Sequence, residues 1–206
     1  MSPPPSITGK RERTKQANRA AILEAAREVF GDIGFGAATV RDIVRGTDLA
    51  TGTFYNYFPD KETVLVALLE ESAGEARVRV RAARRQGTTL EAFVRDGFRA
   101  YFDYLLEDPT TSQLIARNAG TIRAMFDEPS LVAGTEELAE DLRAGVENGL
   151  IPEHDVEYMA AAMVGAAVEI GARMLESAAP DAERATAFVS GLFVAGLRGA
   201  AAEQAR

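Results

Sequence analysis

Apolar residues recur at helical spacing through almost the whole chain. One stripe runs through Ile22, Ala25, Ala26, Val29, Phe30 and Ile33 and stops at Gly34, as expected for an amphipathic helix and its C-terminal glycine. A second stripe runs from Leu90 to Leu105. No segment shows a convincing strand alternation, and no unit repeats at a fixed period. The pattern predicts an all-α protein.

Two short helices are predicted between two long ones in the first 70 residues. Thr39 is placed to cap a short helix, with Asp42 as its partner three residues later. A tight turn at 46–49 separates it from a second short helix at about 50–57. Pro59 ends that helix, and Asp60 begins a long one over about 61–84. Two short helices flanked by glycine are typical of a helix-turn-helix, here at about 39–58.

The rest of the chain is predicted to form a second helical domain. Helices are expected from Leu90 to Leu105 and then at about 110–126, 129–148, 154–177 and 181–203. The domain organisation that follows is a disordered basic leader at 1–12, a DNA-binding domain at 13–60, a linking helix at 61–84 and a second domain at 88–206.

The stretch "TGTFYNYFPDKET", residues 51–63, holds four aromatic residues in five positions. Phe54 and Phe58 are four residues apart, so they lie on one face and are predicted to be buried. Tyr55 and Tyr57 then point outward, beside the small or polar Thr51, Gly52 and Asn56. Such a surface suits phosphate oxygens and base edges.

Lys61 falls in the first turn of a predicted helix, where the helix dipole favours negative charge. An anion held by both the helix N-terminus and the lysine, such as a DNA phosphate, would reverse this mismatch. The alternative is an ordinary solvated lysine.

Charge is distributed unevenly along the chain. Residues 1–63 carry nine Lys or Arg against eight Asp or Glu, and residues 64–206 carry 14 against 23. All three lysines lie within the first 61 residues. A basic N-terminal part in an otherwise acidic chain indicates a polyanionic partner for that part, although a solvent-exposed tail would show the same charge.

Composition argues against several classes of protein. The chain has no Cys, a single His and no Trp, so we expect no disulfide, no cofactor or metal site and no enzymatic activity. A helical-bundle enzyme remains as an alternative without a Glu-x-x-His cluster to support it. The leader has no hydrophobic signal segment, and we expect no apolar run to span a bilayer, so a cytoplasmic protein is predicted.

Residues 13–70 resemble the DNA-binding domain of the TetR family of bacterial transcriptional repressors. The matching segment is "AAREVFGDIGFGAATVRDIVRGTDLATGTFYNYFPDKETVL", and Asn56 is a mild departure, since many members carry a larger ring or His there. The resemblance implies a palindromic operator on double-stranded DNA. The DNA-contacting residues it implies are Thr39, Arg41, Thr51, Gly52, Thr53, Tyr55, Asn56, Tyr57 and Lys61.

The two C-terminal helices carry more apolar surface than one core requires. In the helix at 154–177, one stripe contains Met159 and Met163 and another contains Val164 and Val168. Residues 187–197 are apolar nearly all round. The second apolar face predicts a homodimer through the helices at 154–177 and 181–203, with a fully buried monomeric core as the alternative.

The resemblance further implies a ligand pocket in the second domain, for a lipophilic or aromatic effector. Each aromatic or aliphatic candidate is of a kind more often found in plain core than in a pocket wall, and for Glu169 a pair with Arg173 is favoured over a ligand contact. The candidates are Phe98, Tyr101, Phe102, Asn118, Ile122, Met125, Phe126, Met159, Met163 and Glu169. The function predicted is a repressor released by its effector, and the alternative is a DNA-binding regulator without a ligand.

Overall fold

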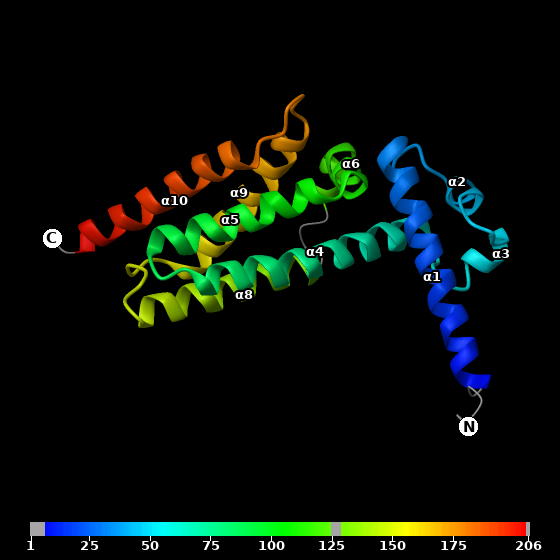
Figure 1. The fold of residues 1–206 in the computed structure, drawn as a ribbon, viewed down its shortest axis with the longest axis horizontal. Helices are drawn as coiled ribbons and strands as arrows, with labels where there is room; N and C mark the ends of the chain where they lie inside the picture. The colour runs from blue at the N-terminus through cyan, green and yellow to red at the C-terminus, as the bar shows by residue number, and fades with distance from the viewer. Residues whose placement is uncertain (1–6, 125–128, 205–206) are drawn as a thin grey trace, which may run out of the picture.

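The structure is a computed structural model that describes residues 7–124 and 129–204. Met125 and Phe126, two of the predicted pocket residues, lie outside the described residues. Within the described part, every regular element is a helix, which confirms the all-α prediction. A small domain of α1 to α3 stands at one end of an elongated helical bundle, and α4 runs from one into the other (Figure 1).

The small domain comprises α1 (Ile7–Asp32), α2 (Val40–Arg45), α3 (Thr51–Phe54) and the start of α4 (Lys61–Gln86). Gly34 follows α1 with φ 82°, a left-handed conformation that favours glycine. Helix α1 begins at Ile7, so residues 7–12 belong to it and not to the predicted disordered leader.

The bundle contains the longer part of α4 together with six further helices. They are α5 (Leu90–Glu107), α6 (Pro109–Arg117), α7 (Ala119–Arg123), α8 (Pro129–Glu147), α9 (Val156–Leu175) and α10 (Ala182–Gln204). The single helix predicted at 110–126 is therefore divided at Asn118, which ends α6 and begins α7.

Two hydrophobic cores meet along α6 and α7. The core of the small domain contains Phe30, Phe54 and Leu65, and it also takes in Leu114 and Ile122 from the bundle. The bundle core is built on α5, α9 and α10, where Phe98 stacks on Phe102 and on Phe193. Because α6 packs against α1 and Ile122 of α7 belongs to the core of the small domain, a shift of these helices reaches the small domain directly.

Helix α9 is long and apolar enough to cross a membrane by length and composition, which the sequence pattern did not predict. Only 28% of its apolar window is buried within the chain. The helix packs against α8, α10, α5 and α6, so it is a helix of the bundle with an uncovered apolar face. Other helices are the expected cover for such a face.

Candidate functional site

The short helix α3 is fixed by its aromatic residues, as predicted. Phe54 and Phe58 are 0% and 3% exposed and anchor the segment in the core of the small domain. A four-residue helix is not stable alone, so this burial holds it in place. Tyr55, in contrast, is 55% exposed. The anchored aromatics therefore present a rigid outer surface.

The outer surface around α3 is small and polar. Thr51, Gly52 and Asn56 are exposed, and a Cβ added at Gly52 would meet no atom within 4 Å. Thr53 is half-buried. A partner can therefore reach the backbone of α3 closely at its first turn.

Tyr57 lies between the outer surface and α1. Its ring packs partly against the core of the small domain, and its Oη accepts a hydrogen bond of 3.0 Å from Asn18 Nδ2. The hydroxyl proton stays available for a phosphate oxygen. Tyr57 is thus less exposed than the outward position predicted for it.

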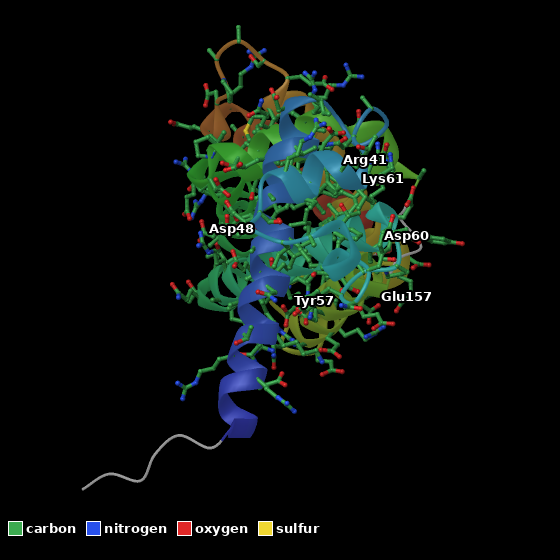
Figure 2. The ribbon with its side chains drawn as sticks, turned by 90° about the vertical axis from the view of Figure 1, so that its right-hand side faces the viewer. Arg41, Asp48, Tyr57, Asp60, Lys61 and Glu157 are labelled. Atoms are coloured by element: carbon green, nitrogen blue, oxygen red, sulfur yellow. The ribbon has the colours of Figure 1, made fainter. Side chains whose placement is uncertain are left out.

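Helix α2 begins with the predicted capping box. Thr39 Oγ1 accepts from the Asp42 backbone N–H at 3.3 Å, and the Thr39 N–H donates to Asp42 Oδ2 at 3.0 Å. Hydrogen bonds from Thr39 hold the pKa of Asp42 below its usual value. Arg41, in the first turn, is exposed and has no hydrogen-bond or ion-pair partner among the residues described (Figure 2).

Lys61 has a structural role that the sequence did not reveal. Its Nζ donates to the carbonyls of Phe35 at 2.8 Å and Ala38 at 2.9 Å, and it lies 4.5 Å from the centre of the Phe35 ring. The lysine therefore ties the α1–α2 loop to the start of α4. Two of its three N–H donors are used in this way, which leaves one for a phosphate.

A largely apolar cavity of about 180 Å³ lies in the bundle, among α4, α5, α6, α7, α8 and α9. Four predicted residues line it: Phe98, Tyr101, Ile122 and Met163. Burial raises the pKa of Tyr101 to about 12, so its hydroxyl is protonated at neutral pH. That hydroxyl has no hydrogen-bond partner in the described part of the chain.

Four other predicted pocket residues do not line this cavity. Phe102 is fully buried in the bundle core, and Met159 packs on the same core from α9. Glu169 accepts a hydrogen bond of 3.3 Å from Arg173 Nε, as the alternative prediction had it. Phe102 and Met159 were candidates because core and cavity wall share one apolar pattern, and contact of these residues with a ligand stays a prediction.

Asn118, the fourth of these residues, joins the two domains instead of facing a ligand. Its Oδ1 accepts from the Phe35 N–H at 2.7 Å, while its Nδ2 donates to the carbonyls of Phe30 at 2.9 Å and Leu114 at 2.7 Å. The side chain is 4% exposed. These bonds use its acceptor and both donor hydrogens, so the buried amide is satisfied by protein alone.

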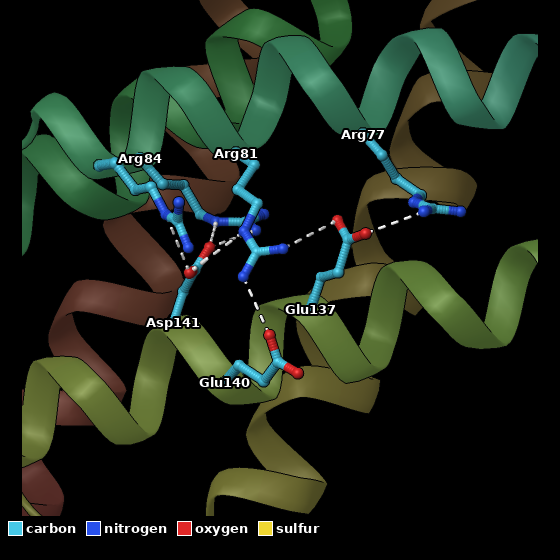
Figure 3. A network of polar contacts seen from close by, with 7 residues as sticks. Arg77, Arg81, Arg84, Glu137, Glu140 and Asp141 are labelled. Atoms are coloured by element: carbon cyan, nitrogen blue, oxygen red, sulfur yellow. Dashed lines mark hydrogen bonds and ion pairs between the residues drawn. The ribbon is translucent and has the colours of Figure 1, made fainter.

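Sequence reasoning missed the polar wall of the cavity. Arg77 and Arg84 of α4 and Glu137 of α8 line it, within a network of ion pairs between these two helices (Figure 3). The repeated arginines of α4 resembled a solvated face in the sequence. The run of carboxylates on α8 complements these arginines in charge. It is the sequence signal that could have predicted the contact between the two helices.

No group of three or more His, Asp or Glu side chains in the described residues could hold a metal ion. The two sites offer hydrogen bonding and charge on the surface of α2 and α3, and a largely apolar cavity in the bundle.

Known proteins are similar to this chain in sequence and in the arrangement of their helices. The family model described as "Bacterial regulatory proteins, tetR family" matches residues 22–68. The HTH-type transcriptional regulator RutR of Escherichia coli is 27% identical over 140 residues, which cover 62% of this chain and 66% of RutR. The chain thus spans a little under two thirds of the length of the curated relatives it matches.

Two solved structures show the same fold with ligands bound. FadR from Bacillus subtilis, in complex with stearoyl-CoA, superposes with a TM-score of 0.69 at 24% identity over 86% of this chain and 98% of FadR. RolR, in complex with resorcinol, superposes with a TM-score of 0.65 at 22% identity over 93% of both chains.

Proposed function

Because the chain belongs to the TetR family of DNA-binding transcriptional regulators, we propose that it is a homodimeric cytoplasmic repressor, released from a palindromic operator by a small effector. The observation that carries the proposal is the surface of α2 and α3. This surface presents small polar groups and the unpaired Arg41, and the buried rings of Phe54 and Phe58 hold it in place. A surface that reads DNA requires such groups in fixed positions.

On this proposal, residues of the helix-turn-helix divide into two sets by the part of the DNA that each would contact. Arg41, Thr51, Gly52 and Tyr55 are open to base edges. Thr39, Thr53, Asn56, Tyr57 and Lys61 are placed to hold the phosphate backbone. Each of these side chains except that of Asn56 is half-buried or already makes a hydrogen bond within the protein. These contacts keep its donor groups in fixed positions.

The dimer is proposed to form through α9 and α10. Tyr158, Phe188 and Leu192 are 79%, 61% and 58% exposed, and they lie on helices already apolar toward the bundle. Large apolar side chains exposed on neighbouring helices indicate an interface. A two-fold dimer would set two α3 helices about one duplex turn apart, roughly 34–36 Å.

The effector is proposed to occupy the cavity of the bundle. The neighbours in complex with stearoyl-CoA and with resorcinol hold very different ligands within one fold, so the class of ligand must follow from the cavity of each chain. Helix α4 lines the cavity and also packs in the small domain. A ligand that binds best to one position of α4 would change the spacing of the reading helices and lower operator affinity.

Selection from a random-sequence duplex library tests the repressor proposal. The wild-type protein is expected to enrich a palindrome. Arg41→Ala is expected to lose roughly 1–3 kcal/mol of discrimination at one base pair in each half-site, since arginine reads guanine through two hydrogen bonds. Arg95→Ala, which removes an exposed arginine from α5, is the control and should enrich the same site. Enrichment of no palindrome would contradict the proposal.

The proposed dimer interface can be broken with one charge. Leu192→Glu is expected to give particles of one chain, 22.1 kDa, by light scattering at micromolar concentration. Val78→Glu is the matched control, since Val78 is 73% exposed on α4, and it should keep the mass of the dimer. A Leu192→Glu protein that remains dimeric would place the interface elsewhere.

A further inference from the structure

The polar wall of the cavity belongs to a network of seven charged residues between α4 and α8. Asp141 is paired with Arg81, Arg84 and Arg85 at 3.5, 2.8 and 3.4 Å. Glu137 is paired with Arg77 at 2.8 Å and with Arg81 at 3.9 Å, and Glu140 with Arg81 at 2.9 Å. Four arginines face three carboxylates, so the network carries one positive charge in excess.

Arg77 is the member of this network best placed to bind an anion, which would neutralise the excess positive charge. Its Nη2 donates to Glu137 Oε1 at 2.8 Å, but its Nε is buried and has no hydrogen-bond partner in the described part of the chain. The stem of Arg77 lies against α8, where a Cβ added at Gly134 would be 3.7 Å from its Cγ. Packing thus holds the Arg77 guanidinium beside the cavity, and Glu137 does not use all of its N–H donors.

The position of Arg77 suits an anion that keeps part of its hydration. Arg77 and Glu137 line the cavity, and their side chains are 34% and 23% exposed. The pair therefore lies where the cavity meets the surface. An anionic group bound there avoids the large desolvation cost of a charge in the apolar interior. The rest of the cavity wall, from Leu69 to Val168, is largely apolar apart from Ser72, Arg84 and the hydroxyls of Tyr101 and Tyr104.

The volume of the cavity limits the apolar part of the ligand. About 180 Å³ is slightly more than the roughly 150 Å³ of an apolar protein cavity that binds benzene. One aromatic ring with a short side chain, or an alkyl chain of similar size, fills that space. The hydroxyl of Tyr101 adds one unpaired donor on the wall.

Building on the effector cavity of the proposed function, we propose that the ligand is a small apolar carboxylic acid whose carboxylate binds Arg77 at the mouth of the cavity. A carboxylate matches the guanidinium through two hydrogen bonds and neutralises the excess charge of the network. Glu137 competes for the same guanidinium. A cationic ligand is disfavoured, because arginines already surround Glu137 and Asp141.

Three probes that differ only in the head group test the proposal by calorimetry on the full-length protein. They are 3-phenylpropanoate, 3-phenylpropan-1-ol and 3-phenylpropylamine, titrated at pH 7. The acid is expected to bind at least tenfold more tightly than the alcohol, as one charge-assisted hydrogen bond provides. The amine should bind most weakly. Equal binding of acid and alcohol, tightest binding of the amine or binding of none of the three overturns the proposal.

Two substitutions with opposite expected signs locate the carboxylate. Arg77→Met should weaken binding of the acid at least tenfold and leave the alcohol unchanged. Glu137→Gln should strengthen binding of the acid severalfold, because it removes the competing charge and keeps an acceptor. Arg79→Met, on the same helix but paired with Glu107 and outside the cavity wall, is the control. Acid binding that Arg77→Met does not change overturns the assignment.

Folding and DNA binding are measured separately, so the possible failures are distinguishable. Circular dichroism establishes that each variant folds. If Arg77→Met does not fold, Arg77→Lys, which keeps the charge but loses the bidentate geometry, replaces it and should weaken the acid more than the alcohol. Operator binding without any probe tests the repressor itself. A protein that binds its operator but shows no preference for the acid contradicts only the ligand class.

Discussion

Asp141→Ala is expected to lower the free energy of unfolding by about 3–5 kcal/mol, the usual cost of removing one partner from a buried ion pair. Asp141 is 8% exposed and Arg84 is 7% exposed, and their side chains meet at 2.8 Å. Burial lowers the pKa of the Arg84 guanidinium, while its hydrogen bond to Asp141 acts in the opposite direction. Without the Asp141 carboxylate, the Arg84 guanidinium is still buried away from water, but it has lost the ion pair that offsets the cost of desolvation.

Urea unfolding followed by circular dichroism at fixed protein concentration measures this loss. Glu140→Ala is the control from the same network, because the Glu140 side chain is 61% exposed. It should change the free energy of unfolding by less than about 1 kcal/mol. The double variant Arg84→Met with Asp141→Leu should recover much of the stability, since apolar residues replace a buried pair well. A double variant no more stable than Asp141→Ala would contradict this reasoning.

The features that the sequence predicted are those decided by residues close together in the chain. The Thr39–Asp42 capping box joins residues three apart. Phe58 lies four residues after Phe54, just beyond the end of α3, and its N–H donates to the Phe54 carbonyl at 3.1 Å. Asp60 caps α4 through a 2.7 Å hydrogen bond from the Thr63 N–H. In each case, helix geometry alone fixes the neighbours, so pattern and structure agree.

The features that the sequence could not predict depend on pairing between distant helices. Arg84 and Asp141 are 57 residues apart, and nothing in the period of either helix records that α4 and α8 lie side by side. Lys61 illustrates the same limit. Its position in a first turn indicated an anion, but its Nζ lies beside carbonyls of the α1–α2 loop, which satisfy the charge by their dipoles.

The sequence indicated Asn118 only as a candidate pocket residue, and its partners could not be predicted. It lies 88 residues from Phe30 and 83 from Phe35. A continuous set of contacts follows. Ile122 lines the cavity near Asn118, Asn118 holds the Phe35 N–H, and Lys61 holds the Phe35 carbonyl together with that of Ala38, next to the cap of α2. This set connects the cavity wall to the helix-turn-helix.

Asn118→Leu should therefore lower the free energy of unfolding by about 2–4 kcal/mol, because it keeps the volume but leaves the Phe35 N–H and the Phe30 carbonyl without their partner. The N–H of Phe35 should also exchange with solvent much faster, as hydrogen exchange followed by NMR would measure. Asn148→Leu is the control, since Asn148 is an exposed residue after α8, and a change within about 0.5 kcal/mol is expected. If Phe35 stayed as protected in Asn118→Leu as in the wild type, Asn118 would not be the residue that holds this loop against α6 and α7.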